Sequence, residues 1–174
     1  SAEYDIGRIA SPAVIGQTVN ALPPHSPHLI DARNRLVVDL AHSGLLLPLS
    51  PVSALVWAGG EILSYANAEQ TGAARYELSD LRRGLFGTGN KVQGHVAGED
   101  FVLLAPDNLM LLENDSLLAL QNFQIFAQGI GDETPVATPI TIAGLATLPR
   151  SPVHGRGQVD QQGTLRLSWI RLPR

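Results

Sequence analysis

The chain has 174 residues, the length of one domain with a short extension, and its 44% apolar and 16% charged residues indicate a substantial core and exclude a mainly disordered protein. It contains no cysteine, which excludes disulfides, thiolate nucleophiles and cysteine-ligated metal centres. The net charge of −4, with Lys91 as the single lysine, argues against nucleic acid as a main partner, and no apolar run approaches the roughly 20 residues that span a bilayer.

Residues 1–34 are predicted to form a connector with one short strand. Prolines interrupt this stretch repeatedly, and proline lacks the amide donor that strands and helices need. Ser11–Gly16 is typical of a short extended segment, and Pro23–His28 of a connector with polyproline character. The chain opens with Ser1 and Ala2 and without an initiator methionine, so we interpret it as part of a longer protein.

Residues 35–148 are predicted to form a β-rich domain. Leu36–Leu40 is short and β-branched, as strands are. Two apolar runs, Ser53–Ala58 and Glu61–Ala66, flank Gly59–Gly60, and this pattern predicts a hairpin because a two-residue primed turn needs positive φ angles. The sequence therefore predicts at least three strands at the start of this domain.

The following segments continue the β pattern. Ala74–Leu78 alternates and predicts a strand, after which Ser79 and Asp80 are expected to cap a helical turn over Leu81–Arg83. Further strands are predicted at Phe101–Ala105, Asn108–Leu112, Asn122–Gln128 and Pro139–Ala143, with a helical turn as one reading of Leu117–Leu120. The sequence thus predicts a mainly β fold, an antiparallel barrel or sandwich with short helical turns.

Residues 149–174 are predicted to form a linker and a β-hairpin. Gly163–Arg171 alternates cleanly between apolar and polar side chains. Its inward-facing side chains are expected to be Leu165, Leu167 and Trp169. Because this piece is too short to close a sheet, it either begins a neighbouring domain or packs back onto the main sheet.

No constellation predicts catalysis, a cofactor or a metal centre. His25 and His28 lie in a proline-rich loop with only Asp31 nearby, which is a poor metal site. Gly84–Lys91 lacks the spacing of a phosphate-binding loop, because its lysine does not follow the second glycine directly. The chain has no Gly-x-Ser-x-Gly elbow. Several carboxylates could supply a glycosidase pair, but a sequence does not show their spacing across a cleft, and they are more typical of solvated positions; they are Glu61, Glu69, Glu77, Asp80, Glu99 and Asp100. We therefore expect a protein that is not an enzyme.

The most unusual motif runs from Tyr76 to Thr88. Two adjacent arginines could bond carbonyls or carboxylates across a domain junction, and the glycines permit tight bends that expose Leu85 and Phe86. An internal turn and an assembly contact explain this motif equally well. The residues assigned to the candidate contact are Tyr76, Arg82, Arg83, Gly84, Phe86, Gly87 and Thr88.

The same motif carries a family resemblance. Gly60–Ala68 and Arg75–Thr88, with its Tyr-x-Leu and Arg-Gly-x-x-Gly-Thr elements, resemble the host-specificity or central hub protein of long non-contractile phage tails and of related gene transfer agents. Gly94–Leu104 is similar to the segment that follows in that family. Arg150–His154 and Gly163–Arg171 resemble its end, where a fibronectin-like domain begins.

The resemblance covers residues 35–105 and 145–171 and implies a structural virion protein at the tail tip, made in the bacterial cytoplasm and encoded by a phage, prophage or gene transfer agent. It implies a homotrimer in the full-length protein, contacts with other tail proteins and with the rest of the same chain, and a cell-surface glycan or receptor as target. The family's glycoside-hydrolase-like barrel has no match here, so no catalytic residue is carried over.

Two other functions are left open. A carbohydrate-binding β-module would stack sugar rings on an exposed aromatic side chain, and the candidates are Trp57, Tyr65, Tyr76 and Trp169. A hydrolytic domain would need a cleft with two close carboxylates.

Overall fold

The computed structural model describes two compact units, Ser1–Ala143 and Gly144–Arg174, which are treated separately. The described residues are 5–9, 11–42, 45, 47–49, 54–110, 122–142 and 153–170.

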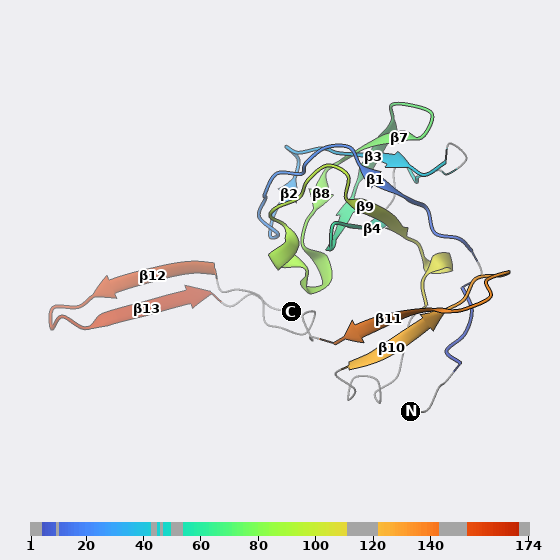
Figure 1. Ribbon diagram of the computed structural model, residues 1–174. Helices are drawn as coiled ribbons and strands as arrows, with labels where there is room; N and C mark the ends of the chain where they lie inside the picture. The colour runs from blue at the N-terminus through green and yellow to red at the C-terminus, as the bar shows by residue number, and fades with distance from the viewer. Residues whose placement is uncertain are drawn as a thin grey trace. The chain divides into compact units, whose positions relative to one another are not determined.

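Nine strands of the first unit form a single antiparallel sheet that curls into a half-barrel (Figure 1). The strands are β1 (Ile15–Thr18), β2 (Ile30–Asp31), β3 (Leu36–Leu40), β4 (Ala54–Ala58), β5 (Glu61–Tyr65), β6 (Asn67–Gln70), β7 (Arg75–Ser79), β8 (Leu81–Arg82) and β9 (Asp100–Leu104). Their order across the sheet is β2-β8-β5-β4-β9-β1-β3-β7-β6. The predicted mainly β, antiparallel architecture is confirmed.

The N-terminal part of the chain is built into this sheet. β1 lies in its middle, hydrogen-bonded to β9 on one side and β3 on the other. β2 pairs with β8 at one edge. Residues 15–31, which the sequence assigns to the connector with its first strand, therefore supply two strands to the sheet.

The core lies inside the curl of the sheet. Strands β3, β7 and β9 bury alternate residues, as the period of two requires. Val38, Val56, Leu63, Leu78 and Phe101 are fully enclosed. Each such side chain contributes about 1.5–3 kcal/mol to folding relative to an exposed position.

The predicted Gly-Gly hairpin is confirmed. β4 and β5 pair from Ala58 and Glu61 outwards, joined by Gly59 at φ 54° and Gly60 at φ 94°. Both angles are positive, which only glycine adopts without strain. A side chain at Gly59 would also displace the Glu99 carboxylate, which lies against this turn.

The predicted helical turn at Leu81–Arg83 is wrong. Asp80 has φ 53° and redirects the chain at once into β8, where Leu81 is buried and Arg82 pairs with Ile30 and Ser64. The helical turns come later, as the 3-10 elements η1 (Leu85–Gly87) and η2 (Gly89–Lys91). Pairing with strands distant in sequence overrides the local capping signal.

Past β9 the chain departs again from expectation. The predicted strand at 108–112 is wrong over its described residues, because Asn108 ends η3 (Pro106–Asn108) and residues 109–110 are in no strand. The Asn108 side chain closes this turn by accepting the Ala105 amide and donating to the Leu103 carbonyl. Residues 111–112 and the alternative turn at 117–120 lie outside the described residues. β10 (Asn122–Ala127) and β11 (Val136–Thr141) form an antiparallel hairpin, which confirms strands in both places.

The second unit contains the hairpin of β12 (Val153–Val159) and β13 (Leu165–Ile170). The predicted burial of Leu165, Leu167 and Trp169 is wrong, because 59–64% of the surface of each residue is exposed. They do share one face of β13, as alternate residues of a strand must.

Candidate functional site

The candidate site lies at the start of the segment between β8 and β9. Its residues 83–91, here called the Arg-Gly loop, contain η1 and η2 (green in Figure 1). This loop contains five of the seven residues that the sequence assigned to the candidate contact, namely Arg83, Gly84, Phe86, Gly87 and Thr88. An ion pair deep in the half-barrel attaches it to β5.

Arg83 and Glu61 form that ion pair, and neither side chain has any exposed surface. Arg83 Nε lies 2.9 Å from Glu61 Oε1, and Nη2 lies 2.8 Å from Oε2. This two-pronged arrangement is the one that the planar guanidinium makes best with a carboxylate. The pair fixes the start of the loop to the first residue of β5.

The remaining guanidinium donors reach other segments. Nη1 donates to the Pro23 carbonyl oxygen at 3.1 Å and lies 3.5 Å from Asp31 Oδ2, while Nη2 donates to the Val92 carbonyl oxygen at 3.2 Å. One side chain therefore joins the connector before β2, β2 itself, β5 and the segment after η2. An arginine placed in this way organises the backbone around it.

Glu61 extends the network to a histidine. His95 Nε2 lies 2.7 Å from Glu61 Oε2, and His95 Nδ1 lies 2.7 Å from Glu99 Oε2. Each ring nitrogen of His95 therefore meets a carboxylate oxygen, so the ring links Glu61 to Glu99. We refer to the five side chains as the buried charge network; they are Asp31, Glu61, Arg83, His95 and Glu99.

Asp31 is held in its ionised form. Burial alone would raise its pKa, but hydrogen bonds from the Asn34 amide and side chain, the nearby His25 and the Arg33 amide together outweigh burial and lower the pKa. Asn34 Nδ2 donates to Asp31 Oδ2 at 2.8 Å. Within the described part of the chain, no buried side-chain nitrogen or oxygen lacks a hydrogen-bond partner.

Gly84 and Thr88 shape the loop itself. Gly84 has φ 64°, its amide donates to Glu61 Oε1 at 2.6 Å, and a Cβ there would lie 2.8 Å from the Gly89 Cα atom. Thr88 Oγ1 accepts the Ile62 amide at 3.0 Å and donates to the Leu85 carbonyl oxygen at 2.7 Å. The loop is thus fastened to β5 at both ends of η1.

Phe86 stands at the tip of η1 with 63% of its surface exposed. Its φ of 51° lies in the left-handed region, where a bulky residue costs about 1–3 kcal/mol. An aromatic ring that is both strained and exposed does not contribute to this domain's own core.

The seven predicted contact residues fall into three groups: residues buried in the domain, residues that shape the loop, and exposed residues. Tyr76 and Arg83 are buried inside the domain, so neither reaches a partner surface, and Arg83 bonds carboxylates and carbonyls of its own domain. Gly84, Gly87 and Thr88 shape the loop. Arg82 and Phe86 are exposed. Sequence reasoning considered Glu61 and Glu99 only as glycosidase candidates and Asp31 only beside the loop histidines, and it did not predict that these carboxylates meet Arg83 and His95 in one network.

The two loop histidines are not brought to a common site. His25 Nε2 lies 3.8 Å from Asp31 Oδ1, whereas the His28 amide donates to Ser26 Oγ. Among the described residues, no group of three histidine, cysteine or acidic side chains is arranged to hold a metal ion.

Of the four aromatic candidates for sugar stacking, two are in the core. Tyr65 and Tyr76 are 2% and 1% exposed, and burial, aided by Tyr76, raises the pKa of the Tyr65 hydroxyl, which donates to the Pro48 carbonyl. Trp57 is half-buried and lines a groove, and Trp169 is exposed on β13.

The fold and loop define a class of β protein, an open antiparallel half-barrel with a glycine-containing loop fastened to it through buried charges. Residues 13–102 match the family described as "Rcc01698-like, C-terminal", which is more than half of the chain, and the chain belongs to this family. The matched range begins just before β1 and ends within β9. No curated protein and no solved structure matches the chain.

Proposed function

We propose that this chain is a structural β-domain of a phage-like tail-tip protein that contributes to tail assembly and host-cell attachment. The observation that carries the proposal is Phe86, a strained and exposed aromatic ring on a loop that buried charges hold rigid. Exposed aromatic side chains on rigid supports are typical anchors of protein interfaces. The family resemblance of the same motif supplies the tail-tip assignment.

The loop geometry gives each letter of the Arg-Gly-x-x-Gly-Thr element a physical role. Arg83 is the buried cation, Gly84 and Gly87 have positive φ angles, and Thr88 bonds to β5. Of the two unspecified positions, Leu85 is half-buried and Phe86 is exposed. The element therefore suits a module that presents different side chains on a constant support.

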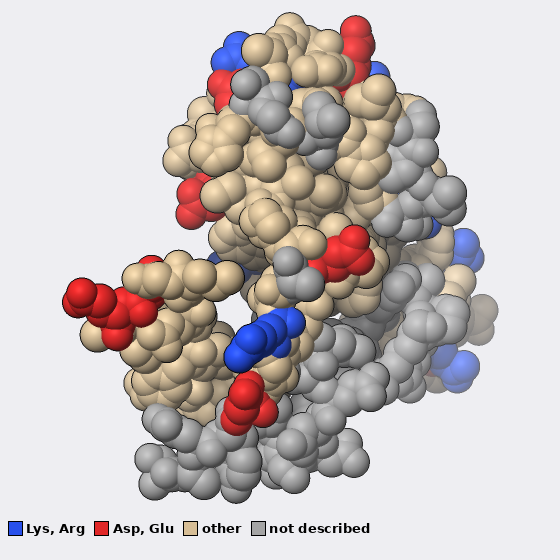
Figure 2. All heavy atoms as spheres, turned by 90° about the vertical axis from the view of Figure 1, so that its right-hand side faces the viewer, with Lys and Arg blue, Asp and Glu red and all other residues tan. Residues whose placement is uncertain are grey.

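The surface composition supports an assembled protein. On the face shown in Figure 2, charged side chains are few and scattered, and uncharged atoms dominate. Large apolar side chains that are more than half exposed occur in loops and elements of both units, and they include Leu29, Phe86, Val96 and Trp169. Surfaces of this kind mark interaction sites when they are contiguous.

The proposal is tested by substituting Phe86 in the full-length protein of a bacterium that produces the particles. Phe86→Ser should reduce the number of complete tails seen by electron microscopy, because losing an aromatic anchor costs about 2 kcal/mol, roughly 30-fold in affinity. Ile130→Ser is the control, since Ile130 is fully exposed at the β10–β11 turn. Wild-type numbers of attaching particles with Phe86→Ser would contradict the proposal.

A further inference from the structure

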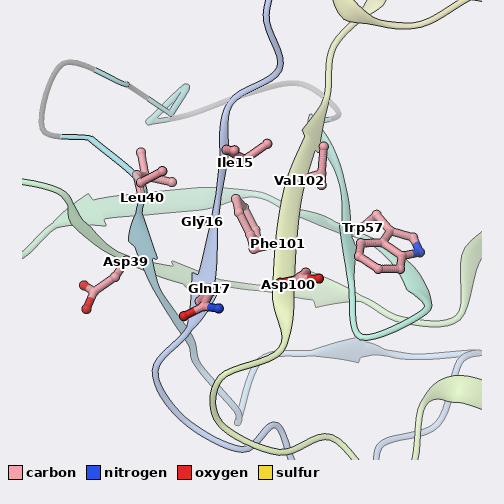
Figure 3. Close-up of a pocket in the computed structure, with 10 residues that line it drawn as sticks. Ile15, Gly16, Gln17, Asp39, Leu40, Trp57, Asp100, Phe101 and Val102 are labelled. Atoms are coloured by element: carbon pink, nitrogen blue, oxygen red, sulfur yellow. The ribbon is translucent and has the colours of Figure 1, made fainter. Parts of the chain in front are cut away.

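The outer face of the half-barrel carries a groove of about 660 Å³ over β3, β1, β9 and β4 (Figure 3). Trp57 borders it on one side and Asp39 on the other, with Gln17 and Asp100 between them. Four adjacent strands span about 14 Å, given the usual spacing of about 4.8 Å. The groove is therefore long enough for an extended ligand.

Strand register places the side chains of the groove in two rows. Trp57, Val102 and Ile15 are direct cross-strand neighbours and form an apolar row. Two residues further along the strands, about 7 Å away, Asp100 and Gln17 are neighbours, and Gln17 in turn faces Asp39. An apolar row thus runs beside a polar row.

The polar row has hydrogen-bonding capacity to spare. Asp39 is paired with Arg75 on β7, with Nη2 2.6 Å from Oδ2, and this pair lowers the pKa of Asp39. Gln17 and Asp100 are exposed, and their side chains make no hydrogen bond with another described residue. An amide and a carboxylate together offer two donors and several acceptors.

We propose that this groove binds a neutral polysaccharide. A sugar ring has an apolar C–H face, which suits the indole of Trp57, and a rim of hydroxyls, which suits the amide of Gln17 and the carboxylate of Asp100. Two carboxylates in the groove and a net charge of −4 disfavour acidic polysaccharides and other anions. A protein segment fits less well, because a peptide that crosses the face of the sheet finds no strand edge for its backbone.

The inference rests on the attachment half of the proposed function and names the chemistry of the surface that would be recognised. It involves a different part of the domain from the Arg-Gly loop, because no groove residue belongs to residues 83–91. Glycan binding and particle assembly can therefore be measured independently.

The test measures binding of the purified chain to an array of neutral and acidic bacterial-surface oligosaccharides, and its mobility in native gels that contain dextran, mannan or polygalacturonate. We expect binding to at least one neutral glycan and none to polygalacturonate. Trp57→Ala should weaken binding at least tenfold, and Asp100→Ala about fivefold. Trp169→Ala and Asp107→Ala are the matched controls, because both residues are exposed outside the groove.

Two further measurements separate binding from folding. In Trp169→Phe, Trp57 is the only tryptophan, and its fluorescence should change when the glycan is added. The double variant Gln17→Ala, Asp100→Ala removes only exposed polar groups and should lose binding while its thermal unfolding stays that of the wild type. Absence of binding to every neutral glycan, binding that Trp57→Ala leaves unchanged, or preference for polygalacturonate would overturn the inference. If the particles assemble and attach to cells although the groove binds no glycan, the proposed function stands and only this inference fails.

Discussion

At the scale of single residues, the decisive feature is the buried positive charge of Arg83, which requires compensation by opposite charges and hydrogen-bond acceptors. Arg83 is completely buried, and its guanidinium is compensated by Glu61 and Asp31 together with two backbone carbonyl oxygens. Burying charges is costly, and a buried ion pair often stabilises no more than apolar residues of the same size would. The main effect of this ion pair is to fix the position of the Arg-Gly loop relative to β5.

Removing one member of this pair should be far more damaging than removing the same group at the surface. Glu61→Gln leaves the buried Arg83 without its main counter-charge and should lower the free energy of unfolding by about 3–5 kcal/mol. Glu77→Gln is the matched control, because Glu77 pairs with Arg35 at 3.6 Å with both side chains about 40% exposed. That change should cost less than about 1 kcal/mol. Urea unfolding measures both variants, and equal losses would argue against the assigned role.

At the scale of elements, local signals predicted some structures and misled on others. Gly59–Gly60 identified the β4–β5 hairpin because turn geometry depends on the turn residues themselves. Leu81 was expected in a helical turn, but its backbone belongs to β8, whose partners are far away in the sequence. The motif around Arg83 was found from its glycine spacing, whereas the direction of the Arg83 side chain was not encoded locally.

Two glycines test the rigidity of the Arg-Gly loop directly: Gly84, which precedes η1, and Gly89, which begins η2. Gly84→Ala should destabilise the domain by about 1–3 kcal/mol, because φ is 64° and the added methyl would meet Gly89 and Val92. Gly89→Ala adds its methyl where no atom lies within 4 Å and should change stability by less than about 0.5 kcal/mol. Thermal unfolding distinguishes the two; similar melting temperatures would mean that the loop is not fixed as described.

At the scale of the whole molecule, the sequence predicted the class of fold better than the site. Alternating strands and glycine turns predicted an antiparallel β protein, and the half-barrel confirms it. The buried charge network could not be predicted, because Asp31, Glu61, Arg83 and His95 are distant in sequence and meet only when the sheet curls. The alternation of β13 was correct, but burial of its apolar face requires a second layer, which a pattern in one strand cannot specify.

The measurement that tests the central claim most directly is the location of this domain in the particle. Antibodies against residues 13–104, applied with gold labels to phage-like particles from the bacterium that encodes the chain, should mark the tip of the tail. The full-length protein extracted from those tips should sediment as a homotrimer. Gold on the capsid or along the tail shaft, or particles that carry none of the protein, would contradict the assignment.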